Sequence, residues 1–130
     1  MKEILIDTNI YSFALKGDRD TVSLLRTMRL IGISSVSIDE LLSGFKGGTR
    51  EKENRRELDE FLDSPRVRIY SVDEDTAEFY AEILNEMRSK GTPIPTNDIW
   101  IASVALQKGL PLYSRDLHFK QVPGLILLRE

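Results

Sequence analysis

Residues 4–9 of the chain read Ile4-Leu5-Ile6-Asp7-Thr8-Asn9, a compact apolar run that ends on three polar residues. A short apolar run bounded by turn-forming residues is typical of a buried strand followed by a turn. We therefore expect a buried strand near the start of the chain, with Asp7 directly at its carboxyl end.

The sequence after this strand alternates short apolar runs with longer amphipathic segments. Further strands are expected at residues 31–33, 67–70, 111–114 and 125–128. Helices are expected to begin at Asp20 or Thr21, at Ser34 or Ser35, near Arg50, at Asp73 or Asp75, and at Thr96. Strands that alternate with helices favour an α/β sandwich with a mainly parallel sheet.

Two of the expected helices have distinctive surfaces. Nine of the eleven residues at 50–60 are charged, so ion pairs from Glu51 to Arg55 and from Arg56 to Glu60 should support a solvated helix. This helix should rest on Leu58, Phe61 and Leu62. The helix after Asp73 should bury one apolar stripe, formed by Ala77, Tyr80, Ala81, Leu84 and Met87.

Composition sets the class of protein. The chain has 130 residues, which predicts one domain over residues 1–130. It contains no Cys, which excludes a disulfide scaffold, a thiolate metal site and a thiol nucleophile. Its sequence shows no apolar run long enough to span a membrane and no signal peptide at the N-terminus. We therefore expect a soluble cytoplasmic protein that does not bind membranes.

Four acidic residues are expected to meet at one edge of the sheet. Asp7 follows the first strand, and Asp116 follows the strand that includes Leu112. Ligands bind outside the carboxyl ends of the strands in an open parallel sheet. Asp98 lies in the first turn of its helix, and Glu40 about one and a half turns into another.

Carboxylates that share one cleft need a cation, because each would otherwise raise the pKa of the others. Oxygen ligands without Cys or clustered His favour Mg²⁺ or Mn²⁺, as one or two ions. Such ions activate water and stabilise the leaving oxygen in phosphodiester cleavage. Taken singly, each acid also has a structural explanation, such as the turn at Asp7 or the helix dipole at Asp98.

Four segments taken together resemble a known family. They are Ile4-Leu5-Ile6-Asp7-Thr8-Asn9, the stretch at 34–44 with Glu40-Leu41-Leu42-Ser43-Gly44, Thr96-Asn97-Asp98-Ile99-Trp100-Ile101-Ala102, and Tyr113-Ser114-Arg115-Asp116-Leu117-His118-Phe119 followed by Val122-Pro123-Gly124-Leu125. In this order they resemble the PIN-domain family, and in particular its single-domain VapC-type toxins. The resemblance covers nearly the whole chain.

The resemblance implies a three-layer α/β/α sandwich that acts as a metal-dependent endoribonuclease. The acidic residues of the family correspond to Asp7, Glu40, Asp98 and Asp116. It also implies supporting polar roles for Asn9 and Ser114, which would orient carboxylates or water. Some relatives carry another acid where this chain has His118, so the number of metal ions stays open. We expect His118, the only histidine, to be structural or peripheral.

The resemblance also implies partners. The expected substrate is RNA, in the form of tRNA or rRNA, and the toxin should form a homodimer and bind a cognate antitoxin protein. Candidate phosphate contacts are Arg19, Lys46, Arg50, Arg115 and Lys120, among which Arg115 and Lys46 are favoured. Apolar residues that could contact a partner, although each also suits the core, are Phe13, Leu42, Phe45, Tyr80 and Trp100.

Two other functions compete with the nuclease. A non-catalytic PIN-fold module that binds RNA or protein would need no acidic site, but all four acids are present. A phosphoryl-transfer domain of the phosphatase type would carry a second Asp where the chain has Asn9, and the paired acids of a receiver domain are not evident.

The net charge of −3 bears on the same question, because nucleic-acid binding normally calls for a basic surface. Setting aside the four site carboxylates leaves 17 acids against 18 Lys and Arg. We therefore expect RNA to bind weakly in the absence of a metal ion.

Overall fold

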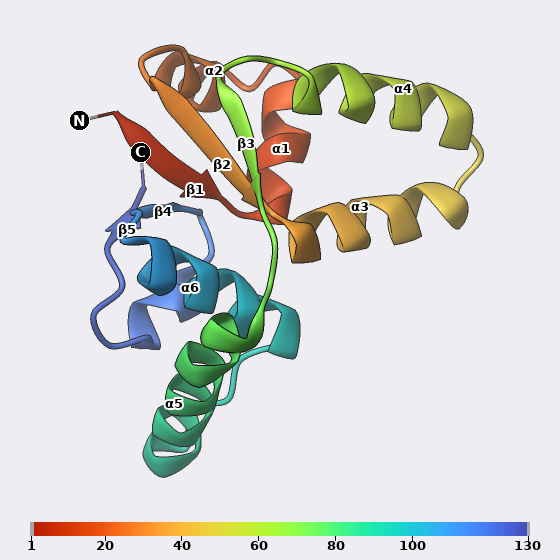
Figure 1. The fold of residues 1–130 in the computed structure, drawn as a ribbon. Helices are drawn as coiled ribbons and strands as arrows, with labels where there is room; N and C mark the ends of the chain where they lie inside the picture. The colour runs from red at the N-terminus through yellow and green to blue at the C-terminus, as the bar shows by residue number, and fades with distance from the viewer. Residues whose placement is uncertain (1, 130) are drawn as a thin grey trace.

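The computed structural model describes residues 2–129, which form a parallel five-stranded sheet with helices on both faces (Figure 1). This confirms the predicted α/β/α architecture. The elements in chain order are β1 (Glu3–Ile6), α1 (Thr8–Leu15), α2 (Arg19–Arg26), β2 (Leu30–Ser34), α3 (Ser35–Lys46), α4 (Glu51–Leu62), β3 (Val67–Tyr70), α5 (Glu74–Lys90), α6 (Thr96–Lys108), β4 (Leu112–Tyr113), η1 (a 3₁₀ helix, Leu117–Gln121) and β5 (Leu127–Leu128).

The order of the strands places a topological switch in the middle of the sheet. The strands lie in the order β3-β2-β1-β4-β5, and every neighbouring pair is parallel. The chain moves outward from β1 to β3 and then returns to place β4 on the other side of β1. Ile6 pairs with Tyr113 in this central register, so the residues that follow β1 and β4 leave the sheet side by side. This is where open parallel sheets bind ligands.

Alternate side chains of β1 divide the core into two halves. Leu5 packs with Leu112 against α5 and α6. Ile4 and Ile6 point the other way and pack with residues of α1 to α4. Each half is buried by a helical layer, as the pleat of a strand requires.

Several helix boundaries differ from the sequence-based prediction. Asp18, rather than Asp20 or Thr21, caps α2 by accepting the backbone N–H of Thr21. Pro95, rather than Thr96, stands at the cap of α6, and its carbonyl accepts the first backbone bonds of that helix. Both observed cap positions lie within a few residues of the predicted caps. Over so short a distance, side-chain type alone does not determine which residue caps the helix.

Two elements were not predicted at all. The segment after Asp7 is the helix α1 rather than a turn, and η1 follows Asp116. Helix α1 is eight residues long and rich in aromatic and β-branched residues, which have low helix propensity. Its formation depends on the Asp7 cap and on the burial of Ile10 and Tyr11.

The ion pairs predicted for α4 are confirmed only in part. In α4, Arg56 pairs with Glu60 as predicted (3.5 Å), but Glu51 pairs with Lys46 and not with Arg55. Arg55 pairs with Asp59 instead (3.3 Å). The helix does pack through its apolar side, with Leu58 buried and Phe61 and Leu62 half-buried.

The buried face of α5 matches the predicted stripe in part. Tyr80, Leu84 and Met87 pack in or against the core as predicted, whereas Ala77 and Ala81 are exposed. Small alanines contribute little area to burial, so the larger side chains decide which face turns inward.

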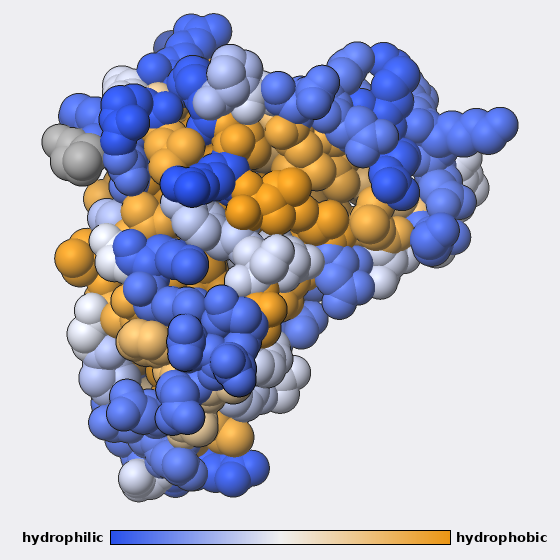
Figure 2. All heavy atoms as spheres, viewed as in Figure 1, coloured by the Kyte–Doolittle hydropathy of each residue, from blue (hydrophilic) through white to orange (hydrophobic). Residues whose placement is uncertain are grey.

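Figure 2 shows apolar side chains gathered where α3 and α4 meet the sheet, and charged side chains over the outer part of α4. Half-buried apolar residues of these two helices are Ile38, Leu42, Phe45, Phe61 and Leu62. Among the described residues, no helix is both long and apolar enough to cross a membrane.

Candidate active site

Four carboxylates from four different segments line one pocket at the carboxyl edge of the sheet. The pocket has a volume of about 400 Å³. It is lined by Asp7, Thr8, Asn9, Glu40, Pro95, Asp98 and Asp116. The sheet topology explains the arrangement: Asp7 follows β1, Asp116 follows β4, and α3 and α6 supply the other two acids.

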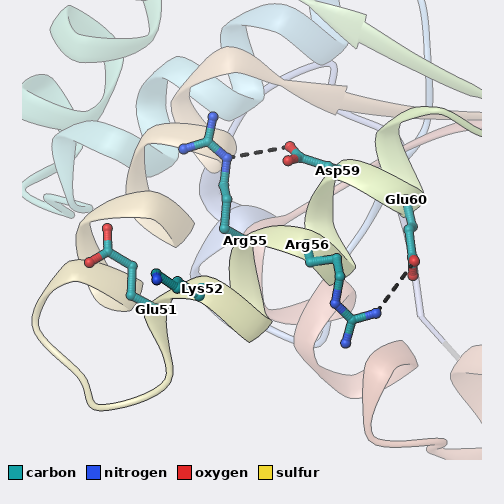
Figure 3. Close-up of a pocket in the computed structure, with 6 residues that line it drawn as sticks. All are labelled: Glu51, Lys52, Arg55, Arg56, Asp59 and Glu60. Atoms are coloured by element: carbon teal, nitrogen blue, oxygen red, sulfur yellow. Dashed lines mark hydrogen bonds and ion pairs between the residues drawn. The ribbon is translucent and has the colours of Figure 1, made fainter.

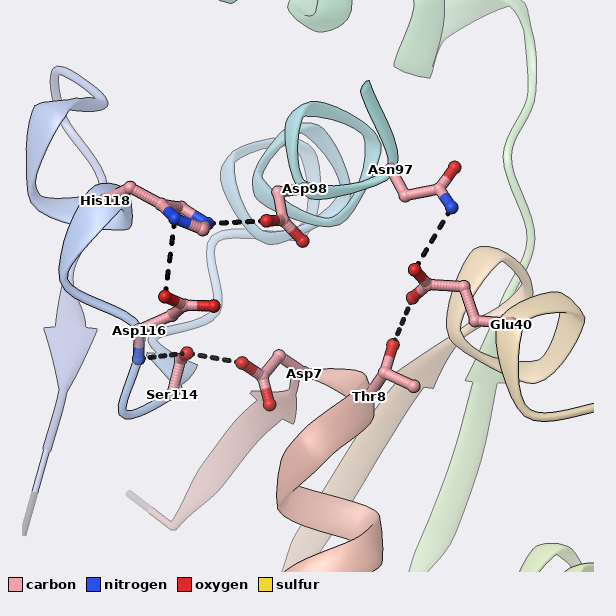
Figure 4. Close-up of polar contacts among 8 residues, drawn as sticks. All are labelled: Asp7, Thr8, Glu40, Asn97, Asp98, Ser114, Asp116 and His118. Carbon is pink, nitrogen blue, oxygen red and sulfur yellow. Dashed lines mark hydrogen bonds and ion pairs between the residues drawn. The ribbon is translucent and has the colours of Figure 1, made fainter. Parts of the chain in front are cut away.

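Asp7 is the most buried of these acids, with 5% of its surface exposed. One carboxylate oxygen, Oδ1, caps α1 by accepting the backbone N–H of Ile10 (3.0 Å). The other oxygen accepts the hydroxyl of Ser114, which in turn accepts the backbone N–H of Asp116 (3.0 Å; Figure 4). Ser114 therefore links the ends of β1 and β4 and fixes Asp7 relative to Asp116.

Glu40 is held from both sides by neutral donors. The Thr8 hydroxyl donates to Glu40 Oε1 (2.5 Å), and the Asn97 amide donates to Oε2 (3.1 Å; Figure 4). Thr8 is also hydrogen-bonded to the Ser37 hydroxyl (2.9 Å). These contacts orient a carboxylate that projects from the middle of α3.

Asp98 and Asp116 are bridged by His118. Its Nε2 lies 2.5 Å from Asp98 Oδ2, and its Nδ1 lies 3.3 Å from Asp116 Oδ1 (Figure 4). Because η1 carries His118 back over α6, a residue expected to be peripheral or structural touches two of the four acids.

Two acids of the site, Asp7 and Asp98, have raised pKa values. Burial raises the pKa of Asp7, while the hydrogen bonds from Ser114 and Ile10 lower it in part. Burial also raises the pKa of Asp98, opposed by its hydrogen bond to His118. The charge of Asp116 raises both pKa values further. Burial and like charge thus both favour the protonated acids.

The donor set fits a divalent cation. Asp98, Asp116 and His118 each offer one ligand atom, and these atoms lie within 4.8 Å of one another. Carboxylate oxygens are the ligands preferred by Mg²⁺ and Mn²⁺, and an imidazole nitrogen is better suited to Mn²⁺ than to Mg²⁺. Asp7 and Glu40 line the same pocket outside this three-residue group.

The other predicted site residues fall into two groups. Ser114 contacts Asp7 as described, and Arg115 lies beside the acids, where it lines a neighbouring pocket with Asp7 and Asp116. Asn9 lines both pockets, but within residues 2–129 its side chain has no hydrogen bond to a carboxylate. Lys46 lies at the end of α3, pairs with Glu51 and lines neither pocket.

Sequence reasoning assigned no role to Thr8 and Asn97, although each stands next to a predicted acid. Asn97 precedes Asp98 at the start of α6, and Thr8 follows Asp7. This adjacency is the signal that could have identified them: a polar residue beside a site acid at a helix start is placed to hydrogen-bond a neighbouring carboxylate.

A wider hollow lies along α4 and shares no lining residue with the pocket of the four acids. Its volume is about 510 Å³, and it is lined by Glu51, Lys52, Arg55, Arg56, Asp59 and Glu60 (Figure 3). Arg55 and Arg56 are paired with acids of the same helix. Three acids and three bases leave no net charge, so this surface is a solvated helix face rather than a site for an anion.

Comparison with known proteins agrees with this geometry. The family model for the PIN domain matches residues 4–125. The chain is 32% identical to Ribonuclease VapC2 of Rickettsia felis over 128 residues, which cover 95% of this chain and 94% of that protein. It is 28% identical to the tRNA(fMet)-specific endonuclease VapC of Salmonella typhimurium, with 96% of each chain covered.

A solved structure supports the same relationship. The crystal structure of VapBC2 from Rickettsia felis, bound to a DNA fragment from their promoter, superposes with a TM-score of 0.90 at 29% sequence identity. The match covers 98% of each chain. The likeness therefore includes the whole sheet and all four acid-bearing segments.

Proposed function

The chain belongs to the PIN-domain family, and on this basis we propose that it is an endoribonuclease, the toxin of a type II toxin–antitoxin pair. The proposal rests on one observation: four carboxylates from separate segments line one pocket, at the topological switch between β1 and β4. The names of the relatives, a ribonuclease and a tRNA endonuclease, support an RNA substrate. We propose that this substrate is a tRNA or an rRNA.

We propose that the pocket holds one or two divalent cations, Mg²⁺ or Mn²⁺. Asp98 and Asp116 would bind the ion with His118 beside them, and Asp7 would complete the site directly or through water. When bound, the cation acidifies water and neutralises charge on the phosphodiester oxygens. The raised pKa values of Asp7 and Asp98 support this proposal, because a cation relieves the cost of ionising them.

In this proposal Glu40 positions the attacking water or accepts its proton. The Thr8 and Asn97 donors fix both oxygens of Glu40 while it faces the pocket. In this proposal the hydroxyls of Thr8 and Ser114 orient the carboxylates of Glu40 and Asp7 and do not attack phosphorus themselves. Hydrolysis by water is the chemistry that these contacts favour.

We propose that the protein forms a homodimer and binds a cognate antitoxin, by analogy with the VapBC2 complex of Rickettsia felis. Apolar area on this chain supports a protein partner. The residues singled out from the sequence as possible contacts are all half-buried rather than fully enclosed: Phe13, Leu42, Phe45, Tyr80 and Trp100.

The proposed function is tested by sequencing RNA ends after incubation of purified protein with cellular RNA and Mn²⁺. We expect cuts at defined bonds in tRNA or rRNA, and none with Asp98→Asn. RNA binding without new ends in either sample would instead support the non-catalytic RNA-binding module.

His118 provides a separate prediction about metal binding. Replacement by Gln should weaken Mn²⁺ binding about 10- to 100-fold, because residues that orient metal ligands have effects of this size. Calorimetric titration with Mn²⁺ at neutral pH measures the change. The control is Lys120→Gln in the same 3₁₀ helix, an exposed position that should leave the affinity unchanged. Equal affinity of His118→Gln and wild type would contradict a role at the metal site.

A further inference from the structure

We propose that the pocket beside the acids is a nucleobase subsite, in which a base next to the cleaved RNA bond stacks on the guanidinium of Arg115. The inference rests on the proposed ribonuclease function and specifies how that site holds its substrate.

The subsite adjoins the acidic pocket directly. It has a volume of about 220 Å³ and is lined by Asp7, Asn9, Phe13, Arg115 and Asp116. Asp7, Asn9 and Asp116 also line the pocket of the four acids. A nucleotide can therefore place its phosphodiester against the acids and its base in the adjoining pocket.

The planar guanidinium of Arg115 is held in place by contacts on one side. Its guanidinium carbon lies 4.3 Å from the centre of the Phe13 ring. One guanidinium nitrogen donates to the Asp18 carboxylate and to the Thr21 hydroxyl (2.9 Å). Thr21 is fully buried, and Asp18 is fixed as the cap of α2. These contacts fix the Arg115 guanidinium on its protein-facing side, while 35% of the side chain stays exposed.

The partners of Arg115 favour a base over a phosphate. Hydrogen bonds from Thr21, and then from Arg115, lower the pKa of Asp18, so this carboxylate is ionised at neutral pH. The pair therefore carries no net charge, which weakens the attraction of this guanidinium for a phosphate. Phe13 covers one face of this guanidinium, and in our proposal the base stacks on the other face, as planar guanidinium groups do with the unpaired bases of RNA.

Asn9 adds polar groups at the rim of the subsite. It is exposed at the start of α1, and across residues 2–129 its side chain has no hydrogen-bond partner. Its amide offers both donors and an acceptor, which can meet the edge of a stacked base. Stacking on Arg115 would thus supply affinity, and Asn9 a preference among bases.

The test uses a short single-stranded RNA that the wild-type protein cleaves at one mapped bond. Copies of this RNA lack the base at one flanking nucleotide at a time. Arg115→Lys keeps the charge and removes the plane, so it should raise KM about tenfold on the complete RNA, with little change in kcat. On the copy that lacks the stacked base, this variant and wild type should have the same KM.

Two further variants separate the subsite from effects on folding. Arg56→Lys makes the same exchange on the exposed face of α4 (Figure 3) and should change KM on no substrate. Asn9→Ala should alter the preferred base at the same flanking position while leaving the unfolding temperature unchanged.

The possible results distinguish a failure of the subsite proposal from a failure of the proposed ribonuclease function. An equal KM penalty for Arg115→Lys on every copy would overturn the subsite, because the contact would then not involve a base. So would the absence of any penalty on the complete RNA. Failure of the wild-type protein to cleave any RNA would instead refute the proposed function, and the subsite with it.

Discussion

Replacement of Asp7 by Asn is expected to lower kcat/KM for RNA cleavage by about 10³-fold or more, since metal-assisted charge stabilisation contributes several kcal/mol to the transition state. Asp7 is the most buried acid of the proposed site, and Ser114 fixes it relative to Asp116. Asn keeps the shape of the side chain but removes the charge that a cation requires. Initial rates on a mapped RNA substrate measure the loss.

The same variant should fold as well as wild type. Asn is also a good helix cap, so the bond from the backbone of Ile10 can be kept. Because burial raises the pKa of Asp7, its ionised form destabilises the metal-free fold at neutral pH. We therefore expect the metal-free variant to unfold at the same temperature as wild type or higher. Undiminished cleavage by the purified, folded variant would remove Asp7 from the catalytic site.

Mn²⁺ should stabilise the wild-type protein strongly at neutral pH and weakly in acid. At a free concentration 100 times the dissociation constant, binding to the native state alone adds about 2.7 kcal/mol, or roughly 10 °C in unfolding temperature. Thermal unfolding with and without Mn²⁺, repeated across pH, measures this effect.

The sign of the pH dependence follows from the raised pKa values of Asp7 and Asp98. Their contribution to metal-free stability is fully present below the ordinary Asp pKa and is lost as the pH rises through the raised values. Cation binding requires the ionised acids, so its benefit grows over the same range. A Mn²⁺ effect of equal size in acid and at neutral pH, or an undiminished effect in Asp98→Asn, would contradict the assignment.

The sequence-based prediction succeeded where the signal is local. Short apolar runs, and an alternating pattern at residues 67–70, located the strands of the sheet, and Asp7 and Asp116, predicted at the ends of two strands, line one pocket. Glu40 and Asp98 were first named from their positions in the expected helices, and the family resemblance then singled them out, because acids on helix surfaces are common.

The remaining contacts depend on pairings between distant segments. Glu40 meets Thr8 across 32 residues and Asn97 across 57 residues. Hydrophobic periodicity carries no information about such polar contacts, which exist only once the sheet order is known. The contacts of His118 with Asp98 and Asp116 were not predicted for the same reason, because they depend on the path of η1 back to α6.

The most direct test of the proposed metal-dependent nuclease is the rate of RNA cleavage by wild-type protein in EDTA, followed by titration with Mn²⁺. We predict no cleavage in EDTA, weak RNA binding under the same conditions, and a saturable return of cleavage as Mn²⁺ is added. Cleavage that continues in EDTA at the Mn²⁺-saturated rate would contradict the central claim that the four carboxylates act through a metal ion.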